Sequence, residues 1–313
     1  MTRGRIHHPI AMIVALALAA FTGAVAIGSI WANDQLLSTG SWVSVSGRML
    51  HNHDVRHRVA VFLGEELTDD TEAQLNAAGQ GAVAEEVVPG LRARQTQLAE
   101  GVMKTKRFQA IWAQANRAGH KALLRVLDEE GNAAEEGAVV VNLTPALRQI
   151  AGVLESEGFG AEFGLTDLVD QIEPGAARIK VLEASELERA QDVVRVIRHL
   201  TAPAVIVTLA LYAFALLLGW RRLSPTLIGV GLALAATGGL ALLARALAGH
   251  AIVDDLLGGA GPDREAADAA WNIATSKIAD LAGIAIGLGA VIVLLVAAVA
   301  IFRKAAEQRT VPG

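Results

Sequence analysis

The sequence predicts a mainly α protein, with four transmembrane helices joined to a helical extracytoplasmic domain that contains a small two-stranded β ribbon. Three observations lead to this fold class. Hydrophobic residues make up 53% of the 313 residues, and they gather in four uncharged blocks. Basic residues collect at those ends of the blocks that would share one side of a membrane. The segment 33–200 separates the first two blocks and is long enough for a domain with its own core.

The charges assign the two sides of the membrane. The short segments expected in the cytoplasm carry one acid, Glu307, and these basic residues: Arg3, Arg5, Arg221, Arg222, Arg303, Lys304 and Arg309. The segment 33–200 carries 25 acidic residues and 17 Lys or Arg. The segment 246–280 carries six acidic residues and two Lys or Arg. Because Lys and Arg concentrate on the cytoplasmic side, the sequence predicts a multi-pass protein of the cell membrane with both termini in the cytoplasm.

The elements follow in a simple order. We expect a cytoplasmic lead (1–8), transmembrane helix 1 (9–32), an extracytoplasmic helical domain (33–200), transmembrane helix 2 (201–220), a cytoplasmic turn (221–225), transmembrane helix 3 (226–245), an extracytoplasmic loop with an amphipathic helix (246–280), transmembrane helix 4 (281–302) and a cytoplasmic tail (303–313). A cleaved signal peptide is the alternative for the first helix. It is disfavoured because the apolar run is longer than a usual signal core and 30–32 is a poor cleavage site.

The helix that enters the second span is the best defined element of the sequence. Ser185 and Glu188 form a capping box at its start. An apolar stripe continues from there, through Leu187, Ala190, Val194 and Ile197. The uncharged run 201–219 then rises about 1.5 Å per residue, enough to cross a core of roughly 30 Å. Pro203 removes one backbone hydrogen bond, which predicts a kink or a restart of the helix.

Within the domain 33–200 the patterns are mainly helical. Helices are expected over 42–67, 85–103, 107–127, 145–157, 166–172 and from 185 onward. Two β-like runs, 138–143 and 178–182, are expected to pair as the ribbon. The acidic stretches 65–72 and 128–136 are interpreted as solvated loops, because neither has the ligand spacing of a calcium loop.

The apolar blocks carry glycines but no ionisable residues in their cores. Gly283 and Gly287 are four residues apart, and the third helix contains Gly229, Gly231, Gly238 and Gly239. Such spacing lets helices pack closely on each other or on a second copy, unless it only reflects a chain rich in glycine. Ion-coupled transporters usually place charges in their spans, so a passive or accessory role is favoured.

Two clusters are candidates for chemistry. His51, His53 and His57 lie close together in the sequence and are weak candidates for a metal site; the alternative is the polar face of a helix. Trp112, Asn116 and His120 are spaced by four along one helix and are candidates for recognition. Their alternative is a buried Asn and His that satisfy backbone groups.

Several classes of activity are excluded or disfavoured. Cysteine is absent, so there is no disulfide, thiol nucleophile or iron–sulfur cluster. The sequence contains no P-loop, dinucleotide fingerprint or nucleophile elbow, so no catalytic residue, enzymatic activity or cofactor is expected. The acidic exterior argues against nucleic acid. Expected partners are membrane lipid, an envelope protein or cell-wall component, and a second copy of the chain.

Three stretches resemble an uncharacterised group of actinobacterial four-helix integral membrane proteins with a large extracytoplasmic helical domain. They are Trp31 with 41–42, the stretch 107–120, and 140–145. The resemblance extends over nearly the whole chain and implies this topology, while the loop 128–136 is longer and more acidic than in that group. It also singles out Trp112, Asn116 and His120.

The sequence therefore favours a non-enzymatic binding or scaffolding protein of the cell envelope, which acts through its extracytoplasmic domain. The alternative is the membrane subunit of a transport system, because the spacing of the spans and domains is similar to the topology of exporter-type permeases. The third and weakest hypothesis is a metal-dependent hydrolase or sensor that uses the three histidines.

Overall fold

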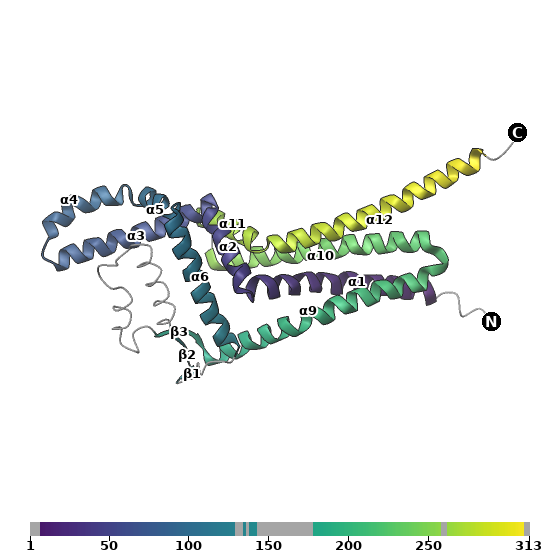
Figure 1. The fold of residues 1–313 in the computed structure, drawn as a ribbon, viewed down its shortest axis with the longest axis horizontal. Helices are drawn as coiled ribbons and strands as arrows, with labels where there is room; N and C mark the ends of the chain where they lie inside the picture. Colours follow the sequence, from purple (N-terminus) through teal and green to yellow (C-terminus); the bar gives the residue numbers. More distant parts are fainter. Residues whose placement is uncertain (1–6, 129–133, 136–137, 143–177, 258–261, 310–313) are drawn as a thin grey trace. The chain divides into compact units, whose positions relative to one another are not determined.

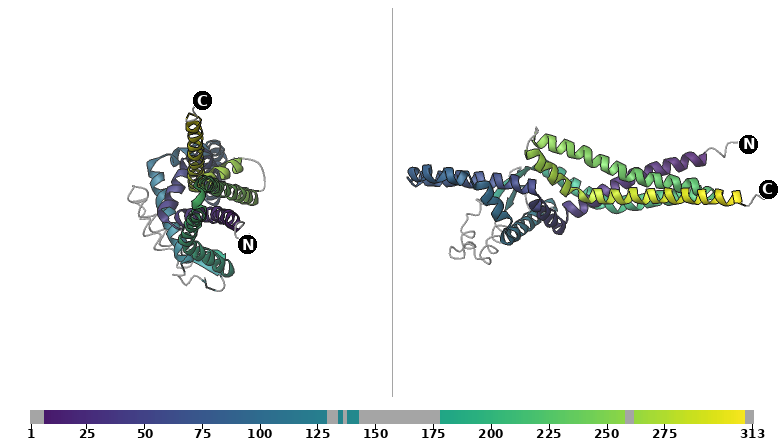
Figure 2. Two further views of the ribbon diagram at one scale, coloured as in Figure 1. Left: turned by 90° about the vertical axis from the view of Figure 1, so that its right-hand side faces the viewer. Right: turned by 90° about the horizontal axis from the view of Figure 1, so that it is seen from above.

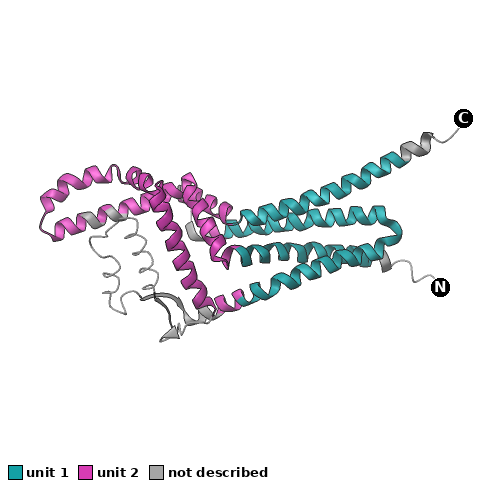
Figure 3. Ribbon diagram, viewed as in Figure 1, with its two compact units in different colours: residues 1–34, 195–251, 275–313 teal, residues 35–194, 252–274 magenta. Residues whose placement is uncertain are grey.

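The computed structural model describes residues 7–128, 134–135, 138–142, 178–257 and 262–309 (Figure 1). The chain forms two compact units, each built from segments that are distant in the sequence (Figure 3). Unit 1 comprises 1–34, 195–251 and 275–313, and unit 2 comprises 35–194 and 252–274. The helices expected at 145–157 and 166–172 lie outside the described residues.

Unit 1 is a bundle of long apolar helices. Its helices are α1 (His7–Trp31), most of α9 (Ala184–Gly219), most of α10 (Leu223–Leu257) and α12 (Ser276–Arg309) (Figure 2). Three stretches of the described chain are long and apolar enough to cross a membrane: Ile10–Leu36, Arg189–Asp254 and Ser276–Arg303. These stretches indicate a multi-pass membrane protein.

The second of these stretches is a helical hairpin. It has 66 residues, which would extend about 100 Å as one straight helix at about 1.5 Å per residue. A 3₁₀ turn, η2 (Trp220–Arg222), instead separates α9 from α10. The hydroxyls of Tyr212 on α9 and Thr237 on α10 are 3.1 Å apart, so α10 runs back alongside α9. The sequence-based division into spans 201–220 and 226–245 corresponds to the two arms of this hairpin.

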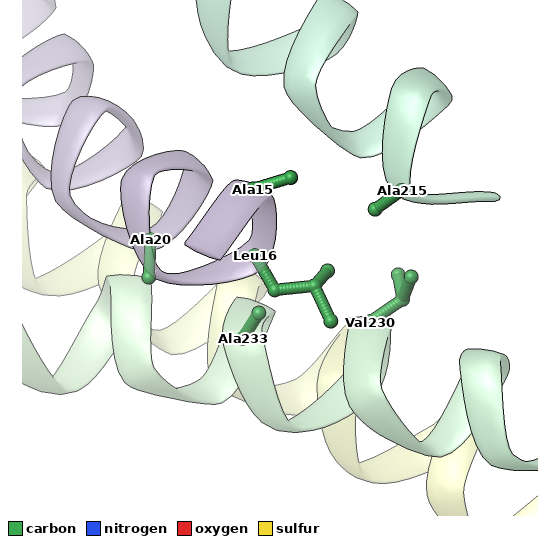
Figure 4. Packing of buried hydrophobic residues seen from close by; sticks show 6 residues of the cluster. All are labelled: Ala15, Leu16, Ala20, Ala215, Val230 and Ala233. Carbon is green, nitrogen blue, oxygen red and sulfur yellow. The ribbon is translucent and has the colours of Figure 1, made fainter. Parts of the chain in front are cut away.

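Small side chains fill the contacts between the helices of unit 1. The core in Figure 4 joins α1, α9 and α10 and consists of Ala15, Leu16, Ala20, Ala215, Val230 and Ala233. A second core contains Ile27, Ala241, Ile278 and Ala282, and so brings α12 onto α1 and α10. Alanine makes up most of the first core and half of the second, which allows the helix backbones to approach closely.

Only some of the glycines serve this packing. A Cβ atom on Gly231 would lie 2.7 Å from the carbonyl oxygen of Gly289, and a Cβ on Gly289 would collide with the carbonyl of Gly231. By contrast, a Cβ on Gly283 or Gly287 would meet nothing within 4 Å. The predicted helix–helix packing is therefore confirmed for Gly231, while the spaced pair Gly283 and Gly287 of α12 leaves room for a Cβ atom at both positions.

Hydroxyl groups tie α9 to α1. The Thr208 hydroxyl donates to the Thr22 hydroxyl at 3.0 Å, and the Thr201 hydroxyl donates to the Ser29 carbonyl at 3.3 Å. Such bonds between helices replace charged pairs where the surroundings are apolar. The predicted restart at Pro203 is wrong, because α9 continues through it. Apolar helices tolerate proline when neighbouring groups compensate for the lost backbone bond.

Unit 2 is helical and begins with α2 (Thr39–His51) and α3 (His53–Ala77), after the short π-helix η1 (Ala32–Leu36). The sequence predicts one helix over 42–67, but the helix is interrupted at Asn52, which separates α2 from α3. The Asn52 side chain accepts hydrogen bonds from the backbone N–H groups of Asp54 and Val55, at 3.0 and 3.1 Å. Asparagine is a strong N-cap residue, so a new helix starts there.

The acidic stretch 65–72 is not a loop, which corrects the sequence-based interpretation. It lies inside α3, where Thr68 is buried and Arg92 of α4 (Gly81–Arg92) bonds Asp69 at 2.9 Å and Glu72 at 3.0 Å. The arginine neutralises two carboxylates from a helix that is distant in sequence, which a local pattern does not reveal. For the second stretch, 128–136, residues 129–133 and 136 lie outside the described residues.

The remaining helices complete unit 2. They are α5 (Gln95–Met103), α6 (Lys106–Leu127) and α11 (Pro262–Ala274), and α4 and α5 replace the single helix expected over 85–103. A core of Leu50, Ala60 and Met103 joins α2, α3 and α5. α11 forms where the amphipathic helix of 246–280 is expected, and it packs on α3 and α2.

A small antiparallel sheet precedes α9. Its strands β1 (Ala134–Glu135), β2 (Ala138–Asn142) and β3 (Arg178–Glu183) lie in the order β1-β2-β3. β2 and β3 coincide with the two runs expected to pair, and the register shifts between Val139 and Val140. The two-residue β1 makes the described sheet three-stranded instead of two-stranded.

Candidate functional site

The candidate recognition residues all project from α6, which is the scaffold of the site. The Thr105 hydroxyl caps its first turn by accepting from the Phe108 N–H at 3.2 Å. Trp112, Asn116 and His120 follow at intervals of four residues and therefore lie along one face of the helix. Their surroundings differ, and so do the roles that they can take.

His120 is a structural side chain that joins α6 to the start of α2. It is buried, with 4% of its surface exposed. Its Nε2 lies 3.0 Å from the Leu36 carbonyl oxygen and its Nδ1 lies 3.1 Å from the Thr39 hydroxyl. A carbonyl oxygen only accepts, so Nε2 carries the proton and Nδ1 accepts from Thr39. Both ring nitrogens are thus occupied by hydrogen bonds within the protein.

Two tryptophans are held in place around this histidine. The Trp42 ring stacks on His120, with centroids 5.0 Å apart and planes 27° from parallel. The Trp112 Nε1 donates to the Ser46 carbonyl oxygen at 3.1 Å, which ties α6 to α2 a second time. The two indole rings are therefore fixed by the structure that surrounds them.

Asn116 is only partly bonded and partly buried. Its Nδ2 donates to the Trp112 carbonyl oxygen at 2.9 Å. Its Oδ1 and the second N–H of its amide have no hydrogen-bond partner among the described residues. The interpretation as a buried pair that satisfies backbone groups thus fits His120, whereas Asn116 keeps a donor and an acceptor available.

These side chains line a shallow depression with a volume of about 350 Å³. Its lining consists of Trp42, Trp112, Ala115, Asn116, Gly119, His120 and Leu123. We refer to it as the aromatic depression. None of its lining residues is acidic, Lys or Arg. Sequence reasoning did not place Trp42 in it, because Trp42 lies on another helix.

The three histidines near position 50 do not converge. His51 ends α2 and its Nδ1 donates to the Gly47 carbonyl at 2.7 Å, while His53 begins α3 beside Asp54. The His53 and His57 rings stack, with centroids 6.0 Å apart. In the part of the chain that the structure describes, no three His, Cys, Asp or Glu side chains are placed to hold a metal ion.

His57 has a different role, as a partner of Glu100. Its Nδ1 donates to a Glu100 carboxylate oxygen at 2.8 Å, and Lys104 donates to the other oxygen at 3.3 Å. The His57 hydrogen bond lowers the pKa of Glu100 below its ordinary value, Lys104 adds to this effect, and partial burial opposes it. The contact joins α3 to α5.

We expect this carboxylate to make stability depend on pH. Because its pKa is lower in the folded state, ionised Glu100 contributes to the free energy of unfolding. This contribution is complete above the unfolded-state pKa and is lost as pH falls through the lower folded-state pKa. In detergent, Glu100→Gln should therefore lower the melting temperature at pH 7, by a difference that narrows steadily below about pH 4.5. Glu86→Gln, on the exposed surface of α4, is the control, and a difference that stays constant with pH would contradict the assignment.

A second concave surface lies between α3, α5 and α6. This groove has a volume of about 220 Å³, and its lining includes Leu63, Leu91, Leu98, Ala99, Val102, Met103 and Phe108. The only polar side chains that line it are Thr68 and Gln95, which contact each other at 2.6 Å. These two polar side chains bond each other and the rest of the lining is apolar, so the groove offers little that would select one ligand over another.

Comparison with known proteins adds no relative: no protein-family model, no curated protein and no solved structure matches this chain.

Proposed function

We propose that this chain is a multi-pass membrane protein of the cell envelope, which binds a ligand or partner through unit 2 and has no catalytic role. In this proposal the hairpin of α9 and α10 crosses the membrane twice, so the chain has four spans and both termini are cytoplasmic. It belongs with the uncharacterised four-helix membrane proteins that its sequence resembles. Unit 2 then faces the outside.

The make-up of unit 2 supports four crossings. The two segments of unit 2, 35–194 and 252–274, are separated in the chain by 195–251, the part of the hairpin that belongs to unit 1. The side chains of Arg58 on α3 and Asp263 on α11 form an ion pair within unit 2. Both segments must lie on the same side of the membrane to pack together. A hairpin that crosses twice satisfies this condition, whereas a single crossing between the segments does not.

The aromatic depression is the observation that carries the binding function. Binding sites are commonly concave and mainly apolar, with a few polar groups that select the ligand. The depression has this composition, with fixed indole rings and the amide of Asn116. Catalysis is not favoured, because it has no acid or nucleophile and both nitrogens of His120 are occupied.

One experiment tests the location and the binding. The chain has no cysteine, so a single cysteine can carry a thiol-reactive, membrane-impermeant photo-crosslinker. In whole cells, Gly40→Cys and Gly101→Cys should both be labelled, because both positions are exposed on unit 2. Gly40 is next to Thr39, which contacts His120, and it does not line the depression itself. Ser224→Cys, beside the turn η2, should be labelled only after permeabilisation. On illumination, only position 40 should yield a specific adduct. The absence of an adduct there, or one equally strong at 101, contradicts the proposal.

The same variants test the alternative of a transport-system subunit. Arg221 and Arg222 of η2 are exposed, and their side chains have no partner within the described chain. An exposed basic turn on the cytoplasmic side could contact a soluble subunit. Crosslinking from position 224 in permeabilised cells to a cytoplasmic ATPase would favour this alternative over the binding protein.

A further inference from the structure

We propose that the aromatic depression binds a neutral sugar that carries an acetamido group. This inference rests on the proposed binding function of unit 2 and names the class of its ligand. It follows from the charge of the depression, from the groups that it leaves unpaired, and from the residue at its exposed edge.

The depression selects a neutral ligand. His120 is the only titratable residue in its lining, and hydrogen bonds to Thr39 and Leu36 hold both of its nitrogens. A charged ligand would therefore find no compensating charge there. The apolar part of the surface consists of two indole rings with Ala115, Gly119 and Leu123. The electron-rich face of an indole attracts the C–H groups that project from one side of a pyranose ring.

The unpaired polar groups point to an amide. Asn116 offers an acceptor, Oδ1, and a donor, its second N–H, because only one of its protons is bonded to Trp112. The N–H of Trp42 also has no acceptor among the residues that the structure describes. An acetamido group has one N–H and one carbonyl oxygen, so it can satisfy both sites of the Asn116 amide. A proline-rich strand also docks on aromatic surfaces, but each proline in it lacks a backbone N–H, so fewer of its residues can donate to Oδ1.

Glycine at position 119 keeps the depression open. It lies in the middle of α6, where glycine costs about 1 kcal/mol relative to alanine. Packing does not require it, because a Cβ atom there would meet nothing within 4 Å. A larger side chain would instead project into the depression. The volume of about 350 Å³ lies near the lower end of the range for small-molecule sites, about 300 to 1,000 Å³, which suits one or two sugar rings.

Calorimetric titration of the full chain in detergent tests this assignment. The probe is the trimer of N-acetylglucosamine, and the trimer of glucose, which has hydroxyls in place of the acetamido groups, is its control. We expect saturable binding of the N-acetylglucosamine trimer. Binding of the glucose trimer should be about tenfold weaker, as expected for the loss of one good hydrogen bond. Asn116→Ala should also weaken binding of the N-acetylglucosamine trimer about tenfold. Retention on insoluble chitin distinguishes a polymer ligand from a free sugar.

Gly119→Leu should abolish binding while the melting temperature is maintained, and Gly101→Leu, at another open and exposed position, should bind like the wild type. Three results would overturn the inference: no binding of the acetylated trimer, unchanged binding by both Gly119→Leu and Asn116→Ala, or equal binding of both trimers. Binding of a proline-rich peptide that Gly119→Leu abolishes would also overturn it. A crosslinked partner at position 40 that is not an acetamido sugar leaves the proposed function standing and removes only this ligand.

Discussion

Gly289→Leu is expected to disrupt the bundle of unit 1, and to give the largest effect of any single substitution considered for it. A Cβ atom at this position would collide with the backbone carbonyl of Gly231, and the backbone cannot rotate away as a side chain could. The helices α10 and α12 must then move apart, which also breaks the contact between Gly238 of α10 and Ala282 of α12. Overpacking in a dense core costs about 3 kcal/mol in unfavourable cases.

The matched control lies two residues away on the same helix. Gly287→Leu makes the same chemical change where a Cβ atom meets nothing within 4 Å, so it should leave stability unchanged or slightly raise it. Thermal unfolding in detergent, followed by circular dichroism and size-exclusion chromatography, compares the two. Similar melting temperatures for both variants would show that α10 and α12 do not pack through Gly231 and Gly289.

His120→Ala is expected to destabilise unit 2 by about 3 kcal/mol. The change leaves the Leu36 carbonyl and the Thr39 hydroxyl without their partner, and it removes the ring on which Trp42 stacks. An unsatisfied buried polar group costs about 1 to 3 kcal/mol, and the cavity left by a large side chain adds to that. Unfolding by urea, followed by tryptophan fluorescence, measures the loss.

His51→Ala is the control for this prediction. His51 is exposed, and its described hydrogen bond stays within its own helix, to Gly47. Its loss should change the free energy of unfolding by less than about 0.5 kcal/mol, as is usual at the surface. If the two alanine variants unfold at the same urea concentration, His120 does not hold α6 to α2.

Local patterns in the sequence predicted the helices of unit 1 well and their partners poorly. The uncharged runs and the basic residues around position 221 place the arms of the hairpin, because the length and charge of a span are local properties. Which glycine packs depends on the rotation of each helix about its axis. Gly289 therefore faces Gly231 while the regularly spaced Gly283 and Gly287 do not.

The candidate site shows the same limit. The interval of four residues correctly placed Trp112, Asn116 and His120 on one face of α6. The residues that hold Trp112 and His120 in place lie far away in the sequence, such as Trp42, which stacks on His120. Their contacts depend on where α2 lies, and the break at Asn52 sets the end of that helix. A search for periodic patterns along one segment does not contain this information.

Unit 2 is built from two separate segments of the chain, and this constrains the order in which it can fold during synthesis. α11 is the last part of unit 2 to be synthesised, and both arms of the α9–α10 hairpin emerge from the ribosome before it. At about 5 to 20 residues per second, the segment 35–194 waits several seconds for this final piece. During that interval the surfaces of α2 and α3 that α11 covers stay bare. The nascent protein therefore passes through a stage in which a chaperone, or misassembly, can compete for those surfaces.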